Sequence, residues 1–256
     1  MFEDWCELEE KRDDKKRLWK LIEKPGGRET ISDQLTETIR SHYDRLERIA
    51  ECIRDLGYEQ TAAIFAERVP SLLTAQSGDL GEILATELIE EKTSYTVPVR
   101  RLRYKDGREM ALRGDDFIGV GIDNQDRLRL LKGESKSRQN LDRTAIEEAR
   151  AALSNNHGRP TPISALFIAD RLMDEEGEKG VLGRRIRNEV VARPIATRYV
   201  AHALFTLSGN RPPRALEDDF HAVDGERRHF IINLHVQDHR DFIEMAYERA
   251  VNFGNE

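Results

Sequence analysis

The sequence predicts an α/β protein in which a mixed β-sheet is flanked by helices and preceded by a helical N-terminal region. Two observations lead to this fold class. Apolar residues recur at spacings of three and four over much of residues 1–76, as on the buried face of a helix. Beyond residue 77, short apolar runs typical of strands, above all 117–122 and 128–131, alternate with helical segments. We therefore expect a helical region over residues 1–76 and an α/β domain over residues 77–256.

Three helices are expected in the N-terminal region. The first spans residues 7–23 and ends before Pro25-Gly26-Gly27. The second begins at Ser32 and carries apolar residues at helical spacing as far as residue 56, with Gly57 as its C-cap. The third covers residues 59–69 and stops before a proline.

The segment that follows is expected to supply one helix and four strands. The helix spans residues 80–92, after Ser77-Gly78-Asp79. Residues 97–104 and 108–112 predict two strands joined at an Asp-Gly turn, which is a strong hairpin pattern. The apolar runs 117–122 and 128–131 predict a second pair, with a turn at residues 124–126.

The C-terminal part is expected to be mainly helical. Residues 162–172 are apolar and fit either a helix or a strand. The remaining expectations are a helix over 142–153, a basic helix over 182–193, an apolar helix over 195–207, a strand over 228–236 and a closing helix over 238–253.

The composition is that of a chain with a heavily solvated surface and no membrane segment. The 256 residues include 48 acidic and 41 basic side chains, which gives a net charge of −7. No run approaches the roughly 18 apolar residues that a transmembrane helix needs, and the charged start of the chain is unlike a signal peptide. Cys6 and Cys52 form no disulfide or zinc pattern, so we expect a reducing, cytoplasmic location.

Acidic and basic side chains stand at the ends of the two central strands. Asp116 opens the first strand, and Glu134-Ser135-Lys136 follows the second. Because side chains alternate along a strand, Glu134 and Lys136 point the same way, and Asp116 can reach them from a neighbouring strand. An acid followed by acid-x-lysine on the next strand is typical of PD-(D/E)xK nucleases, which share a restriction-endonuclease-like mixed sheet. Asp115 competes for the first position, but strand alternation groups Asp116 with Ile118 and favours Asp116.

This set of residues is suited to metal-dependent cleavage of phosphodiesters. Mg²⁺, or Mn²⁺ in its place, prefers oxygen ligands and keeps several waters, so Asp116, Glu134 and the Ser135 carbonyl would suffice. Lys136 would orient the attacking water or stabilise developing charge. Glu82, on the helix that precedes the strands, is a further candidate ligand.

Basic residues are concentrated around the candidate site. Residues 100–138 hold 11 Lys or Arg against 7 Asp or Glu, although the whole chain is acidic. DNA binding depends on such cations. The candidate phosphate-binding residues are Arg100, Arg101, Arg103 and Arg138.

The chain also resembles the HamA nuclease family of the Hachiman antiphage system over roughly residues 75–256. The resemblance rests on residues 81–87 and 98–103, on Gly114-Asp115-Asp116 with Ile118-Gly119, on residues 132–138 and on residues 196–202. It implies a PD-(D/E)xK fold, a metal-dependent DNase and a helicase partner (HamB-like) that restrains it. By this resemblance Asp116, Glu134 and Lys136 match the nuclease motif.

These residues are consistent with two functions. The first is a sequence-tolerant DNA nuclease that acts as a defence effector. The alternative is a non-catalytic adaptor that binds DNA or the helicase on a nuclease-like fold. No Walker-type phosphate loop is present, so any ATPase activity must come from another chain.

Overall fold

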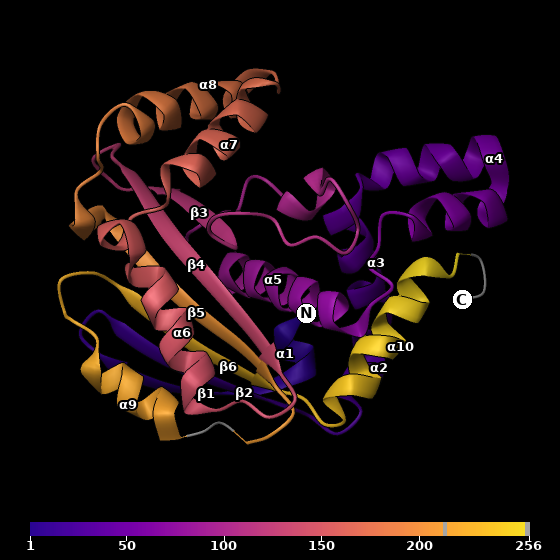
Figure 1. Cartoon of the computed structure of the whole chain (residues 1–256), viewed down its shortest axis with the longest axis horizontal. Coiled ribbons are helices and arrows are strands. Elements are labelled where there is room, and N and C mark those ends of the chain that lie inside the picture. Colours follow the sequence, from indigo (N-terminus) through magenta and orange to yellow (C-terminus); the bar gives the residue numbers. More distant parts are fainter. Residues whose placement is uncertain (212–213, 254–256) are drawn as a thin grey trace.

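A six-stranded mixed sheet lies at the centre of the part of the chain that the computed structural model describes, residues 1–211 and 214–253 (Figure 1). The strand order is β1-β2-β6-β5-β4-β3. Strands β2, β6, β5 and β4 are parallel, and the antiparallel pairs β1–β2 and β3–β4 form the two edges. The strands are β1 (Cys6–Asp13), β2 (Lys16–Glu23), β3 (Phe117–Ile122), β4 (Leu128–Arg138), β5 (Val200–Ser208) and β6 (His229–His235). The predicted fold class, a mixed sheet flanked by helices, is confirmed.

Helices cover both faces of this sheet. The α-helices are α1 (Phe2–Trp5), α2 (Gly27–Thr30), α3 (Ser32–Tyr43), α4 (Leu46–Ala66), α5 (Leu73–Lys92), α6 (Arg143–Ser154), α7 (Pro162–Met173), α8 (Gly177–Ile186), α9 (Arg214–Ala222) and α10 (His239–Val251). Short 3-10 or π turns occupy η1 (Arg101–Tyr104), η2 (Asn155–Gly158), η3 (Arg187–Val191) and η4 (Thr197–Tyr199). No helix of the described residues is long and apolar enough to cross a membrane.

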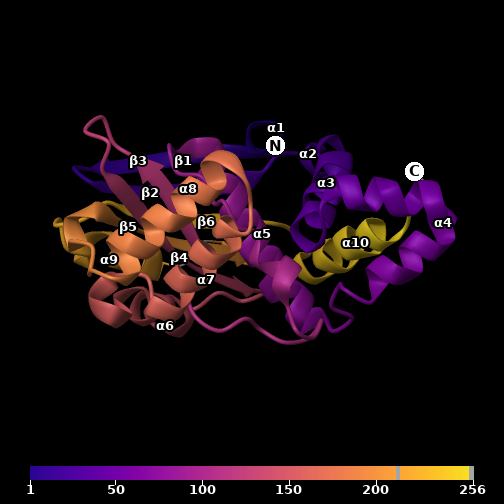
Figure 2. The ribbon, with the colours of Figure 1, turned by 90° about the horizontal axis from the view of Figure 1, so that it is seen from above.

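The core is divided by the sheet because side chains alternate along each strand. Phe205 of β5 packs with α5, α3 and α10 in the largest apolar cluster, whereas its neighbour Leu204 packs with α6 and α9 on the opposite face. In Figure 1, α6 and α9 lie across the front of the sheet. A third cluster joins β3 and β4 to α7 and α8 through Ile118 and Ile168. In Figure 2, α3, α4 and α10 gather at one end of the molecule.

The prediction of a helix over residues 7–23 is wrong, because this segment forms the hairpin β1–β2. Every residue of β1 after Cys6 is exposed, so its charges hide the alternation that would identify a strand. Strand β2 buries Leu18, Trp19 and Leu21 and pairs in parallel with β6. The helices predicted from Ser32 onward are present as α3 and α4, with a break near residues 44–45 and a left-handed Gly57 inside α4.

The N-terminal hairpin therefore belongs to the same sheet as the C-terminal strands. The boundary predicted between residues 76 and 77 falls inside α5, which extends from Leu73 to Lys92. Seven residues were missing from the predicted start of this helix, because Ser77 and Gly78 suggested a turn there.

Two further predictions are wrong. Residues 97–104 and 108–112 form no strand pair; they contain η1 and irregular backbone, and Thr96 alone bridges to Val120 of β3. Residues 195–207 form no α-helix, because they contain only the short 3-10 turn η4 before β5, whose nine residues are all buried. A parallel strand covered on both faces has a continuous apolar sequence that a buried helix shares.

Other expectations for the C-terminal part are confirmed. Helix α6, strand β6 and helix α10 lie where they were predicted. The ambiguous segment 162–172 is helix α7, which begins with Pro162 after the N-cap Thr161. The basic helix begins earlier than expected, at Gly177, and passes into the π turn η3.

Candidate active site

The candidate residues meet where helix α5 passes the paired strands β3 and β4. Phe117 pairs with Gly133, so Asp116 lies directly before β3 and beside Glu134. The Asp116 Oδ2 atom accepts a hydrogen bond from the Ser135 amide at 2.7 Å. This bond fixes the first predicted acid against the strand that carries the other two predicted groups.

Helix α5 can approach β4 here because residue 81 is glycine. A Cβ atom at Gly81 would lie 2.7 Å from the Ser135 Oγ atom, which is too close for an ordinary contact. The next residue along the helix is Glu82. The missing side chain thus helps to bring the Glu82 carboxylate toward the site.

Glu134 and Lys136 lie on the same face of β4, as strand alternation predicts. The Lys136 Nζ atom donates to the Glu134 Oε1 atom at 2.7 Å. Glu134 is 9% exposed, whereas the Lys136 side chain reaches the surface. The ammonium group therefore lies between a mostly buried carboxylate and solvent.

The carboxylates of this site repel one another in a setting with little water. Burial raises the pKa of Asp116, and the neighbouring Glu134 charge raises it further. Burial also raises the pKa of Glu82 well above its ordinary value, with the Asp116 charge as the next cause. Burial raises the pKa of Glu134 too, although the hydrogen bond from Lys136 opposes the shift. Asp116 thus interacts with both other acids and is electrostatically central.

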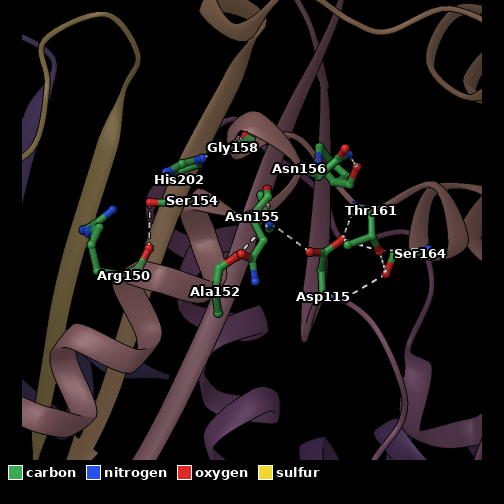
Figure 3. A network of polar contacts seen from close by, with 12 residues as sticks. Asp115, Arg150, Ala152, Ser154, Asn155, Asn156, Gly158, Thr161, Ser164 and His202 are labelled. Atoms are coloured by element: carbon green, nitrogen blue, oxygen red, sulfur yellow. Dashed lines mark hydrogen bonds and ion pairs between the residues drawn. The ribbon is translucent and has the colours of Figure 1, made fainter.

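Asp115 points into a different network, which Figure 3 shows. Its Oδ2 atom accepts from the Thr161 amide at 2.7 Å, and its own amide donates to the Ser164 Oγ atom at 2.9 Å. Its Oδ1 atom lies 3.3 Å from the Nζ atom of Lys132, which is almost completely buried on β4. Lys132 also donates to the carbonyls of Ala152 and Asn155.

Strand alternation does not determine where Asp115 and Asp116 point, because β3 begins only at Phe117. Gly114, with a left-handed φ of 98°, redirects the chain just before them. Asp115 is thereby bound to the start of α7, and Asp116 is left to face Glu134. The preference for Asp116 now rests on these contacts instead of on the pattern.

Three of the four predicted phosphate-binding arginines are engaged within the protein. Arg100 pairs with Glu90 at 2.6 Å and with Glu87, and Arg103 donates to the Ser41 carbonyl at 2.9 Å. Arg101 is buried and donates to the carbonyls of Arg113, Asp115 and Asp116, so it holds the loop that carries the two acids. Arg138, at the end of β4, is the most exposed of the four and donates to the neighbouring Ser137 carbonyl at 2.9 Å.

A buried polar network that was not predicted from the sequence lies one helical turn before Glu82. Asp79 pairs with Lys105 at 2.8 Å, and its Oδ2 atom also accepts from the Tyr43 hydroxyl at 2.6 Å. The Tyr43 hydroxyl is 3.0 Å from that of Tyr247 on α10. Asp79 stands on the same helix as the buried residues Leu80 and Ile83. An acid at such a position could have indicated that it is buried and paired with another polar group.

The donor set suits a hard divalent cation in chemistry but is not a complete ligand cage. Asp116 and Glu134 offer oxygen atoms, the ligands that Mg²⁺ prefers. Within residues 1–211 and 214–253, however, no three His, Cys, Asp or Glu side chains converge closely enough to hold a metal ion. One oxygen of Asp116 is occupied by the Ser135 amide and one of Glu134 by Lys136. The structure thus brings together two carboxylates, with Glu82 within electrostatic reach.

Comparisons with known proteins identify the family. The chain is 27% identical over 193 residues to the Hachiman protein HamA of Bacillus cereus. That alignment covers 75% of this chain and 66% of the relative, which is slightly less than two thirds of its length. The model of the HamA family matches residues 1–250, nearly the whole sequence. The chain therefore belongs to the HamA family.

Proposed function

We propose that this chain is a divalent-metal-dependent, largely sequence-nonspecific DNA nuclease that acts as the effector of a bacterial antiphage defence system. The observation that carries the proposal is the placement of Asp116 beside Glu134, with Lys136 bonded to Glu134 at 2.7 Å. The name of the Bacillus cereus relative, a Hachiman protein, supports the defence role. The helicase partner that would restrain the nuclease is part of the proposal and rests on the family resemblance.

The chemistry of the proposed site follows from its charges. A bound Mg²⁺ or Mn²⁺ ion would neutralise a phosphate and lower the pKa of a water. Asp116 and Glu134, with the Ser135 carbonyl and Glu82, are the groups that would hold the cation. Burial and mutual repulsion already penalise their negative charges, so a cation there would remove an unfavourable interaction. Lys136 would then be free to donate to the phosphate or to the attacking water.

The direct test is cleavage of plasmid DNA by the purified chain with Mg²⁺ or Mn²⁺, and its loss with EDTA. Glu134→Ala and Lys136→Ala should each abolish cutting while the protein stays folded. The chain offers a matched control, since Glu9 and Lys11 form another acid-x-lysine pair on the exposed edge strand β1. The double variant Glu9→Ala/Lys11→Ala should cut like the parent. Undiminished cutting by a Glu134→Ala/Lys136→Ala variant would show that the site is assigned wrongly.

A non-catalytic adaptor is the second candidate, and one observation favours it. The described residues contain no ready three-ligand metal cage, and Lys136 occupies an oxygen that a metal would need. The adaptor function predicts DNA or helicase binding without cutting under any metal condition. Purification of the chain with its operon neighbours, followed by cleavage assays on the separated chain, decides between the two.

A further inference from the structure

A basic groove of about 640 Å³ lies at the end of the sheet away from the candidate active site. It is formed by the β3–β4 turn, by the starts of β5 and β6 and by the β1–β2 turn. In Figure 2 the β3–β4 turn projects at the upper left. Arg129 near the start of β4 is five residues from Glu134, which corresponds to roughly 17 Å along an extended strand. The groove is therefore separate from the site proposed for cleavage.

The groove has an excess of positive charge in an acidic protein. Its walls include six basic residues, Lys15, Arg127, Arg129, Arg198, Arg227 and Arg228. They include two acidic residues, Asp123 and Glu226, so the local balance is +4 while the chain carries −7. This excess is a local property of the fold and does not follow from the composition.

The carboxylates present neutralise only part of this charge. Asp123 pairs with Arg127 at 2.9 Å and with Arg129 at 2.8 Å. Among the residues that the structure describes, Lys15, Arg198 and Arg228 have no carboxylate oxygen within 4 Å. Lys15 donates to the Gly225 carbonyl and Arg198 to the Tyr199 hydroxyl instead. All three side chains belong to exposed residues.

Tyr199 holds three guanidinium groups together. Those of Arg129, Arg198 and Arg127 lie 4.3, 4.8 and 5.2 Å from the centre of its ring. Each contact is a favourable cation–π interaction, but the like charges repel one another. An anion in the groove would remove that repulsion, and the guanidinium groups are already ordered to receive it.

We propose that this groove binds the sugar–phosphate backbone of DNA, without regard to sequence, as an anchoring site distinct from the candidate active site. Five of the six cations are arginines, whose planar forks match phosphate oxygens, although the buried guanidinium of Arg227 donates inward to the Gly158 carbonyl. An open groove also suits a chain of phosphates. The proposal rests on the proposed function to the extent that the anchored DNA is the DNA that is cut, but binding itself needs no metal.

The test is DNA binding by the full chain in EDTA, measured by fluorescence anisotropy with a labelled mixed-sequence DNA over a range of salt concentrations. The variant Lys15→Ala/Arg198→Ala/Arg228→Ala removes three charges that no described carboxylate pairs with. It should weaken binding by roughly tenfold or more and reduce the slope of log affinity against log salt by about 2 to 3. Urea denaturation checks that the variant is folded.

The matched control is Arg48→Ala/Arg214→Ala/Arg240→Ala. It removes the same charge from exposed helix positions, each of which has an acidic partner four residues away. Its DNA affinity should stay within about twofold of the parent, since no groove residue changes. Equal effects of the two triple variants, or no DNA binding by the parent, would overturn the proposal. So would unchanged DNA affinity in the groove variant together with loss of a copurifying protein, which would make the groove a protein contact.

The two proposals can fail separately. Anisotropy in EDTA measures DNA binding without cutting, and plasmid cleavage with Mg²⁺ or Mn²⁺ measures cutting. A parent that binds DNA through the groove but cuts under no metal condition would contradict the nuclease proposal alone. If the parent cuts DNA and the groove variant binds DNA as tightly as the parent, only the groove proposal is contradicted.

Discussion

Two adjacent acids, Asp115 and Asp116, have different environments and are expected to have different functions. Asp115 is 4% exposed, its carboxylate pairs with Lys132 and accepts from the Thr161 amide, and its own amide donates to the Ser164 hydroxyl. Asp116 has one backbone donor and lies beside other carboxylates. A buried ion pair is destabilised strongly when one partner is removed, because the other charge stays buried and unpaired. Removing the charge of a carboxylate that lies among other carboxylates instead relieves repulsion and is not expected to lower stability.

We therefore predict a contrast between Asp115→Asn and Asp116→Asn. The first leaves the Lys132 ammonium buried without its counter-charge and should lower the free energy of unfolding by about 3–5 kcal/mol. The second keeps an oxygen for the Ser135 amide and removes a repelling charge, so in EDTA it should leave stability unchanged or raise it while abolishing cutting. Urea denaturation and plasmid cleavage, run on both variants, measure the contrast. A stable, inactive Asp115→Asn with an active Asp116→Asn would exchange the two roles.

At the scale of elements, the position of Asp116 depends on how closely β3 and β4 pack. A Cβ atom at Gly133 would lie 2.2 Å from the ring of Phe117, the residue that pairs with it. The ring therefore lies directly over the glycine. Asp116 directly precedes Phe117, so a shift of the Phe117 ring would move the Asp116 carboxylate relative to Glu134.

Gly133→Ala is predicted to damage both stability and cleavage. Overpacking a buried site of this kind typically costs about 1–3 kcal/mol, and the displaced Asp116 should reduce cutting. Gly78→Ala is the control, since no atom lies within 4 Å of a Cβ at that helical position. It should stabilise the protein by about 0.5–1 kcal/mol and leave cutting unchanged. Urea denaturation and plasmid cleavage measure both effects. Equal stabilities and equal cleavage rates for Gly133→Ala and Gly78→Ala would contradict the close packing of Phe117 over Gly133.

The elements also show what the sequence could predict. Helices α6 and α10 and strand β6 were predictable from their periodicity, and β3 and β4 from short apolar runs bounded by turn residues. Strand β5 was mistaken for a helix because both of its faces are buried and periodicity is lost. Strand β1 was mistaken because charged residues on a solvated edge follow no pattern. Its identity depends on β2 and, through β2, on pairing with β6 more than 200 residues away, which local pattern does not reveal.

The candidate site was predictable in part for similar reasons. Glu134 and Lys136 lie within a regular strand, so alternation placed them correctly on one face. Arg101 was expected to bind phosphate because a basic run resembles a solvated surface. Its guanidinium instead points inward to three backbone carbonyls. Such a role depends on a loop path that no periodicity encodes.

At the scale of the whole molecule, several histidines are buried, and this burial makes stability depend on pH. His202 on β5 and His229 on β6 lie with their ring centres 5.3 Å apart, and both are nearly inaccessible to water. Burial lowers the pKa of His202 to about 3, and the nearby Arg227 charge acts in the same direction. Burial lowers the pKa of His229 to about 4, with Arg150 as the next cause. Burial also lowers the pKa of His42 and His239.

These shifts predict that the buried histidines lower the free energy of unfolding as the pH falls from 7 to 5, whereas the raised pKa values of Asp116, Glu82 and Glu134 act in the opposite direction. In that range the unfolded chain binds protons on histidines whose ordinary pKa is about 6.5, whereas native His202 and His229 stay neutral. At these two histidines the unfolded state therefore binds more protons, and each contributes a fall in the free energy of unfolding of up to about 1.4 kcal/mol per pH unit as the pH falls. His202→Gln should reduce the slope of unfolding free energy against pH by about that amount, whatever its effect on absolute stability. Urea denaturation at several pH values in EDTA measures these slopes, and equal slopes for the parent and His202→Gln would show that His202 binds protons to the same extent in the native and unfolded states.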